Sequence, residues 1–217
     1  MPKTATRVDV DALVASLLDD PGDDDVEGRV LAAASGLLLE RGLAGLEVDQ
    51  VAERSGVGRS TVYRRFDDRN GLLTATVAHE ARRFLALLAG SVAEIDDTEE
   101  QVVAAFALGL RLVRDGDFGS LLRSEPLLLQ LLTVDSGPIV AAARDQLVAE
   151  AARREPGVDP ARGAGAAEML IRLAISFVLS PATALDLRDK EIEASVRRHI
   201  APLVRDARRS LAGAPRY

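Results

Sequence analysis

Residues 48–66 read VDQVAERSGVGRSTVYRRF, and this stretch decides the fold. Its first half predicts a short helix that ends at Gly56, and its second half predicts another that begins near Arg59. Two short helices joined by a tight glycine turn have the geometry that places one helix in the major groove of DNA. The stretch therefore indicates a helix-turn-helix whose second helix contacts the bases.

The second of these helices has two different faces. Val62 and Phe66 are four residues apart, so they share one side and are expected to face the rest of the domain. Val57 precedes the expected N-cap Gly58, and its spacing to Val62 is that of a hydrophobic staple. The opposite side carries polar and basic residues, namely Arg59, Ser60, Tyr63 and Arg64. We expect this second side to be the functional surface.

The distribution of charge matters more than its sum. The net charge of −7 disfavours contact with phosphates. Residues 1–27, however, hold eight acidic and two basic side chains, so most of the deficit lies there. Residues 54–69 hold five arginines and two aspartates, which indicates a phosphate-facing patch.

The rest of the chain predicts an all-α fold, because apolar residues recur at spacings of three and four. We expect an acidic N-terminal arm over residues 1–25, a three-helix DNA-binding domain over 26–73 and a helical domain over 74–217. Further helices are expected over 69–89, 99–114, 121–132, 138–154, 164–179 and 190–211, the last kinked at Pro202.

Several classes of site are excluded by composition. The chain has no cysteine, so disulfides, thiolate metal sites and cysteine nucleophiles are absent. His79 and His199 are the only histidines, and they lie on different predicted helices. Because no acid, base and nucleophile converge, we expect no enzyme activity, no metal site and no cofactor.

The sequence shows no targeting or membrane signal. The N-terminus lacks a secretory pattern. The longest uncharged stretch, residues 173–185, has 13 residues, whereas a spanning helix needs roughly 20. We therefore expect a cytoplasmic protein with no membrane partner.

Residues 26–73 resemble the TetR family of bacterial regulators. The motifs that carry the resemblance, in order, are Arg29, Ala33, Ala34, Glu40, Gly42, Val51, Ala52, Ser55, Gly56, Val57, Thr61, Val62, Tyr63, Phe66, Arg69, Leu72 and Leu73. Three positions depart from the family pattern: Glu47 and Gly58 stand where threonine and serine usually cap helices, and Ser60 stands where glycine is common. A glycine cap in place of serine costs only a few tenths of a kcal/mol.

The resemblance implies roles for individual residues. Thr61 and Tyr63 are expected to bind phosphates, and Arg69 to add a charge where the next helix begins. Arg59, Ser60 and Arg64 are best placed to contact base edges. For Arg65 two alternatives stay open: contact with phosphate, or an ion pair with Asp67 or Asp68.

The helical domain over 74–217 has wide apolar stripes that suit either core packing or an apolar ligand site. In the second interpretation the phenylalanines surround the ligand, an arginine orients an acidic group, and His79 lies where the two domains join. The candidate ligand-binding residues are His79, Phe84, Phe106, Arg111, Phe118, Arg172 and Phe177.

A homodimer is expected. The last helix carries an apolar stripe which, beside Leu173 and Phe177, suits a four-helix bundle across a two-fold axis. The resemblance assigns the dimer interface to the same two helices. The candidate dimerisation residues are Leu173, Phe177, Ile192, Val196, Ile200 and Leu203.

The resemblance implies a transcriptional repressor that binds double-stranded operator DNA and is released by a small apolar or amphipathic ligand. The helix over 69–89 is then the lever between the domains. The alternative is a helical carrier or interaction protein with a vestigial helix-turn-helix. Two roles stay open for the acidic arm: it covers the Arg59 face as a DNA mimic, or it is a disordered extension.

Overall fold

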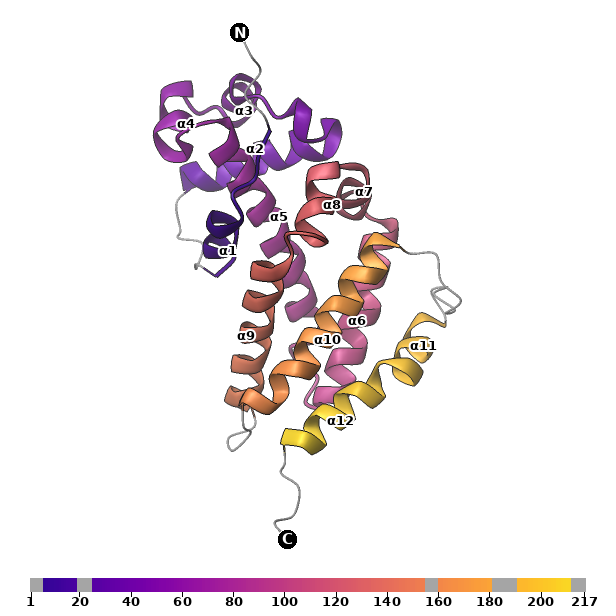
Figure 1. Cartoon of the computed structure of the whole chain (residues 1–217). Helices are drawn as coiled ribbons and strands as arrows, with labels where there is room; N and C mark the ends of the chain where they lie inside the picture. Colours follow the sequence, from indigo (N-terminus) through magenta and orange to yellow (C-terminus); the bar gives the residue numbers. More distant parts are fainter. Residues whose placement is uncertain (1–5, 19–24, 155–159, 181–190, 212–217) are drawn as a thin grey trace. The chain divides into compact units, whose positions relative to one another are not determined.

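The structure is a computed structural model, and it describes residues 6–18, 25–154, 160–180 and 191–211. All regular structure within these ranges is helical, which confirms the all-α prediction (Figure 1). The helices are α1 (Val10–Leu18), α2 (Asp25–Arg41), η1 (Leu43–Gly45), α3 (Val48–Ser55), α4 (Arg59–Phe66), α5 (Arg69–Val92), α6 (Thr98–Asp115), α7 (Asp117–Ser124), α8 (Pro126–Leu132), α9 (Gly137–Arg154), α10 (Pro160–Leu179), α11 (Ile192–His199) and α12 (Ala201–Leu211).

The chain forms two compact units. Unit 1 consists of residues 1–85 and 121–138, and unit 2 of residues 86–120 and 139–217. The domain boundary expected after residue 73 differs from this division. Leu72, Leu73 and Ala78 of α5 are fully buried, so the beginning of α5 belongs to the core of unit 1.

The core of unit 1 forms around α2, which packs against α3, while α3 packs against α4. Its largest fully buried side chains include Val30, Leu38, Leu46, Val51 and Val62. Gly56 ends α3 in the left-handed conformation, with φ of 68°, and the chain then turns into α4. Such a φ costs a residue with a Cβ atom about 1–2 kcal/mol, so glycine is favoured in this turn.

A second turn of unit 1 joins distant parts of the chain. Gly42 follows α2 with φ of 70°, and the N–H of Leu43 donates a hydrogen bond of 2.9 Å to the Glu125 carboxylate, between α7 and α8. A Cβ atom on residue 42 would collide with that carboxylate. Gly42 is therefore favoured by its φ, and a larger residue there would have to displace the Glu125 carboxylate from its hydrogen bond to Leu43.

The described part of the N-terminal arm packs on α5. Val8 and Leu13 are buried, the N–H of Asp9 donates to Thr74 Oγ1 at 3.1 Å, and Arg82 donates to the Ser16 carbonyl at 2.9 Å. Residues 6–18 are thus a packed part of unit 1 and not a free extension. The acidic run over residues 19–24 lies outside the described residues.

Two predicted helices are each divided in two by a proline. Proline lacks the N–H that continues a helix, and it disfavours helical backbone at the preceding residue. The helix expected over 121–132 is broken at Glu125, before Pro126. The helix expected over 190–211 is interrupted at Ile200 and resumes as α12, with Pro202 in its first turn.

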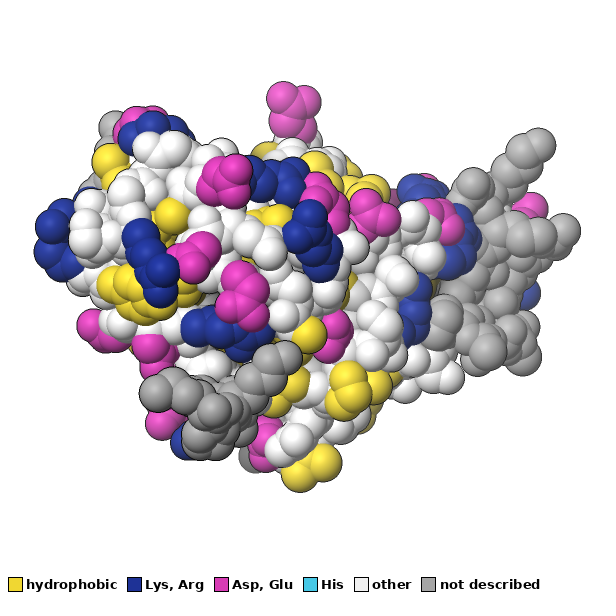
Figure 2. Space-filling view, turned by 90° about the horizontal axis from the view of Figure 1, so that it is seen from above, with side chains coloured by type: hydrophobic (Ala, Val, Ile, Leu, Met, Phe, Trp, Pro, Cys, Tyr) yellow, Lys and Arg dark blue, Asp and Glu magenta, His cyan; other side chains and the backbone are white. Residues whose placement is uncertain are grey.

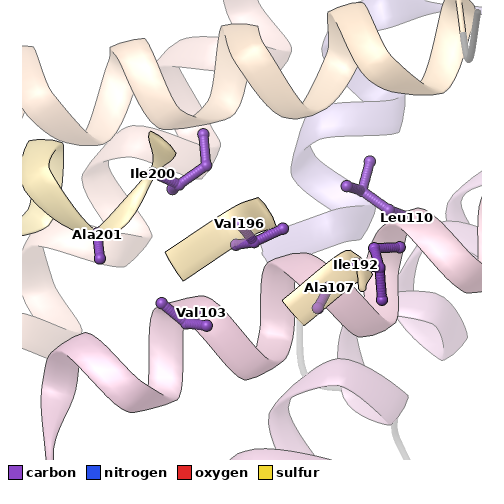
Figure 3. Close-up of a cluster of buried hydrophobic side chains, with 7 residues drawn as sticks. All are labelled: Val103, Ala107, Leu110, Ile192, Val196, Ile200 and Ala201. Carbon is purple, nitrogen blue, oxygen red and sulfur yellow. The ribbon is translucent and has the colours of Figure 1, made fainter. Parts of the chain in front are cut away.

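Unit 2 has its own core, in which α6 packs against α10, α11 and α12. Its buried cluster consists of Val103, Ala107, Leu110, Ile192, Val196, Ile200 and Ala201 (Figure 3). Ion pairs border this cluster: Glu100 binds Arg197, and Glu99 binds Arg205 at 3.1 Å. The Arg197 hydrogen bond lowers the pKa of the Glu100 carboxyl group.

The burial of this cluster bears on the predicted dimer face. Ile192, Val196 and Ile200 are at most 4% exposed, because they pack against α6 of the same chain. This burial favours a core role for these three side chains over the predicted dimer contact. Leu173 and Phe177 are partly buried against the same cluster, and Leu203 is half-buried.

The turn at Gly56 provides a test of this description. Gly56→Ala places a Cβ atom at a positive φ and should lower the free energy of unfolding by about 1 kcal/mol. Gly28→Ala is the matched control, because Gly28 is exposed within α2 and a Cβ atom meets nothing there. The control should stabilise by about 0.5 kcal/mol. Urea titration followed by circular dichroism measures both changes, and equal effects would contradict the description of the turn.

Candidate nucleic-acid interface

The orientation of α4 is set by its two buried side chains. Val62 is 1% exposed and Phe66 is 7% exposed, so one side of α4 faces the core. Val57 is buried as well, as the predicted staple requires. The helical period then turns the other side to solvent, where Ser60, Tyr63 and Arg64 are exposed.

Arg59 begins α4 and is held by two neighbours. Its Nη1 lies 2.8 Å from Asp49 Oδ1 on α3. Its guanidinium carbon lies 5.4 Å from the centre of the Tyr63 ring, a cation–π distance, and Nη2 lies 3.5 Å from the Tyr63 hydroxyl. The Tyr63 hydroxyl and the Asp49 carboxylate raise the pKa of the Arg59 side chain further above its usual value. Arg59 therefore stays charged.

Three other predicted residues of α4 differ in exposure. Arg64 is exposed and forms no hydrogen bond or ion pair with any residue that the structure describes. Ser60 is exposed, and Thr61 is half-buried with its N–H donating to the Gly58 carbonyl at 2.8 Å. Arg64 is thus the arginine of α4 whose charge is left for an external partner.

Arg69 has a structural role within unit 1. Its Nε donates to the Leu46 carbonyl at 2.8 Å and its Nη2 to the Leu43 carbonyl at 2.6 Å. Its Nη1 donates to Thr6 Oγ1 at 3.2 Å. These bonds hold the start of α5 to the segment around η1, and the phosphate contact expected for Arg69 stays a prediction.

The remaining arginines of residues 54–69 also have partners. Arg54 forms a bidentate pair with Glu40 at 2.7 and 2.9 Å, which lowers the pKa of the Glu40 carboxyl group. Arg65 lies 3.3 Å from Glu27 of α2, a contact that neither predicted alternative included. The basic patch expected from composition is therefore largely neutralised, and Figure 2 shows arginine side chains beside carboxylates on this surface.

The candidate ligand-binding residues are divided between the two units. His79 and Phe84 belong to unit 1, whereas Phe106, Arg111, Phe118, Arg172 and Phe177 belong to unit 2. Phe106 and Phe177 meet edge to face at 6.1 Å and pack against the buried cluster of unit 2. This contact favours the core interpretation for both rings.

Arg172 lies at the surface of unit 2. Its side chain is 55% exposed and donates to Glu168 at 2.9 Å, one turn earlier on α10. This pair accounts for the charge of Arg172 without a ligand, and its predicted role toward an acidic group stays a prediction.

Two residues that shape this region were missed in the sequence. Asp49 and Glu125 are not among the predicted site residues. Their partners lie 10 and 82 residues away, respectively. Pro126 signals the helix break at Glu125, but no signal in a single sequence pairs Asp49 with Arg59.

Two family profiles match the chain. Residues 30–76 match the profile described as "Bacterial regulatory proteins, tetR family". Residues 97–198 match "Bacterial Tetracyclin repressor, C-terminal domain". The chain belongs to the TetR family. Both parts of the expected architecture are thereby confirmed: an N-terminal helix-turn-helix and a helical C-terminal domain.

Relatives from Mycobacterium tuberculosis align with most of this TetR-family chain. An uncharacterised HTH-type transcriptional regulator is 28% identical over 186 residues, which span 82% of this chain and 85% of the relative. The HTH-type transcriptional regulator AlkX is 29% identical over 180 residues, with 80% and 82% covered. This TetR-family protein is accordingly a DNA-binding transcription regulator, and the carrier alternative finds no support among these relatives.

A solved structure shares the fold. The TetR family repressor AlkX from Dietzia sp. strain DQ12-45-1b superposes with a TM-score of 0.64 at 24% identity. The match covers 82% of this chain and 97% of that protein. Among the described residues, no single helix has both the length and the apolar composition needed to cross a membrane.

Replacement of Arg69 tests its structural position. Arg69→Ala removes three hydrogen bonds and leaves two carbonyl groups without their charged donor, so the free energy of unfolding should fall by about 2 kcal/mol. Arg64→Ala, on the exposed side of α4, is the matched control, and it should change the free energy of unfolding by no more than about 0.5 kcal/mol. Urea titration of both variants measures the difference, and a harmless Arg69→Ala would show that these bonds do not stabilise unit 1.

His79 gives unit 1 a pH dependence. Burial lowers its pKa below the usual value, the arginines at 82 and 83 add to this effect, and the carboxylate of Glu80 opposes it. The unfolded chain therefore takes up this proton first as the pH falls. The free energy of unfolding should decrease as the pH falls below about 6.5.

His79→Gln should flatten this dependence between about pH 7 and pH 5, because it removes the titrating group. Urea titrations at several pH values measure the slope. The control His199→Gln replaces the exposed histidine at the end of α11 and should leave the slope in place. An unchanged slope in His79→Gln would assign the dependence to other groups.

Proposed function

We propose that the outer face of α4 binds operator DNA and that the chain is a repressor. Arg64 and Ser60 contact base edges, whereas Tyr63 and Thr61 bind phosphates. The observation that carries the proposal is the burial of Val62 and Phe66, which leaves this polar face outward on a helix of the helix-turn-helix. Recognition helices of this class place their first turns in the major groove.

Arg64 is the principal residue in this proposal. Its guanidinium is exposed and has no partner among the described residues, so no ion pair with any of these residues has to break when it binds. An arginine that donates two hydrogen bonds to guanine O6 and N7 contributes about 1–3 kcal/mol of discrimination. Loss of Arg64 should therefore affect sequence preference more than general affinity.

The regulator acts as a homodimer in this proposal, so that two copies of α4 reach half-sites about one helical turn apart. With Ile192, Val196 and Ile200 packed against α6, the remaining candidates are Leu173 and Phe177 of α10 and the half-buried Leu203 of α12. Met169 is 52% exposed, and Leu173 and Phe177 are partly exposed on the same helix. These side chains suit the apolar centre of a two-fold interface.

A small apolar ligand releases the repressor in this proposal. Leu170 and Leu173 of α10, which are partly exposed beside the buried cluster, offer apolar surroundings in unit 2. The solved relative AlkX is described as implicated in biodegradation of n-alkanes, so n-hexadecane is a suitable first ligand to test. A ligand can release DNA only by binding the released state more tightly, with a typical coupling of about 1–3 kcal/mol.

Arg64→Ala and Tyr63→Phe test the DNA contact, with a palindromic operator selected from a random duplex library as the probe. Arg64→Ala should weaken binding by about tenfold or more and relax preference at one position of each half-site. Tyr63→Phe should weaken binding to all sequences alike, because it removes a phosphate contact. Fluorescence anisotropy across a salt series measures both effects.

Arg172→Ala, on α10, is the control for these variants, since it also removes one exposed arginine. It should leave operator affinity within about twofold. If Arg64→Ala binds the operator as well as Arg172→Ala does, the proposal that the outer face of α4 (the reading face, with Arg59, Ser60, Tyr63 and Arg64) contacts the bases is wrong.

A further inference from the structure

The contact between Asp49 and Arg59 joins the two helices of the helix-turn-helix across their outer surface. Nη1 of Arg59 lies 2.8 and 3.0 Å from the two carboxylate oxygens of Asp49. Both side chains are well exposed, at 60% and 64%, so this pair contributes little to folding. The main effect of the pair is instead on the position of the Arg59 side chain.

The pair is costly for general DNA binding. A carboxylate beside the recognition helix repels phosphates, so Asp49 lowers affinity for any duplex. The dipole of α3 explains an acid in its first turn, but it does not require contact with Arg59. An acid that lowers affinity and yet binds a residue of the reading face points to a role in selectivity.

We propose that Asp49 is a positioning residue that orients Arg59 for the reading of a guanine in the major groove. This inference rests on the proposed function of the α4 face. Asp49 contacts Nη1, and Tyr63 accepts only one long hydrogen bond from Nη2, so Nε–H and the second N–H of Nη2 remain for two parallel hydrogen bonds to guanine O6 and N7. The Tyr63 ring lies against the same guanidinium and limits its movement.

The physical gain is a smaller loss of conformational entropy on binding. A free arginine side chain populates many rotamers, and binding to a base restricts it to one of them. Asp49 and Tyr63 restrict Arg59 within the protein, so less freedom is lost when the base is bound. Because Asp49 also repels phosphates everywhere, it widens the ratio between specific and non-specific affinity.

The test uses the full-length chain and a random duplex library. Selection with the wild-type protein gives the operator, and selection with Arg59→Ala identifies the base pair whose preference depends on Arg59. Asp49→Asn should then reduce discrimination at that base pair by about three- to tenfold and raise affinity for random duplex. Preference at the other positions should stay unchanged.

Glu53→Gln is the matched control, because it neutralises an exposed carboxylate of the same helix that forms no ion pair with a described residue. It should raise affinity for random duplex without changing discrimination at the Arg59 base pair. Asp49→Glu, which keeps the carboxylate, should restore most of that discrimination. In the Arg59→Ala background, Asp49→Asn should have no further effect on sequence preference.

Several results would overturn the inference. Unchanged discrimination in Asp49→Asn would show that Asp49 does not position Arg59. Increased discrimination would show that Asp49 keeps Arg59 away from the base. An equal loss at all positions would indicate a purely structural effect. If the operator depends on Arg64 but not on Arg59, this inference alone fails; if the wild-type chain selects no sequence, the proposed function fails with it.

Discussion

The burial of Val62 and Phe66 is the constraint on which the DNA-binding surface depends. Both side chains belong to one side of α4, and a helix of eight residues has no freedom to bury that side without exposing the other. Gly56 supplies the backbone turn that brings α4 onto the core, and Val57 anchors its entry. The outward direction of Ser60, Tyr63 and Arg64 follows from these apolar contacts, so hydrophobic packing decides where the polar chemistry of this regulator lies.

Arginine has two different uses within the same short segment. Arg54 and Arg65 connect helices through carboxylates, and Arg69 holds backbone carbonyls near η1. Arg64 remains without a partner among the described residues. Most arginines of residues 54–69 are therefore paired within the chain, although several of them lie at the surface. This division agrees with the overall acidity of the chain, since a selective DNA-binding protein gains little from a strong and unselective attraction to phosphates.

Local signals account for what the sequence analysis predicted correctly. The helix-turn-helix follows from Gly56, the staple and the spacing of Val62 and Phe66, each of which acts within ten residues. What the sequence does not reveal is the set of contacts between distant residues. An apolar stripe such as Ile192, Val196 and Ile200 has the same pattern whether it faces α6 or a second chain. Likewise, the charge of Arg69 looks available until the carbonyls of Leu43 and Leu46 are placed beside it. Tertiary partners decide both cases, and periodicity does not reveal them.

The hydrogen bond from the Leu43 amide to Glu125 has a consequence for modularity. The helix-turn-helix lies within the first third of the chain. The turn between α2 and η1, which precedes it, is nevertheless stabilised by Glu125, 82 positions after Leu43. The DNA-binding part of unit 1, residues 1–85, is therefore not structurally complete without residues 121–138. A chimaera that transplants only residues 1–85 onto a foreign sensor would lose this carboxylate, and the new host would have to supply an acceptor at the same place. Chimaeras between regulators of this kind should fold more often when residues 121–138 are transferred together with residues 1–85.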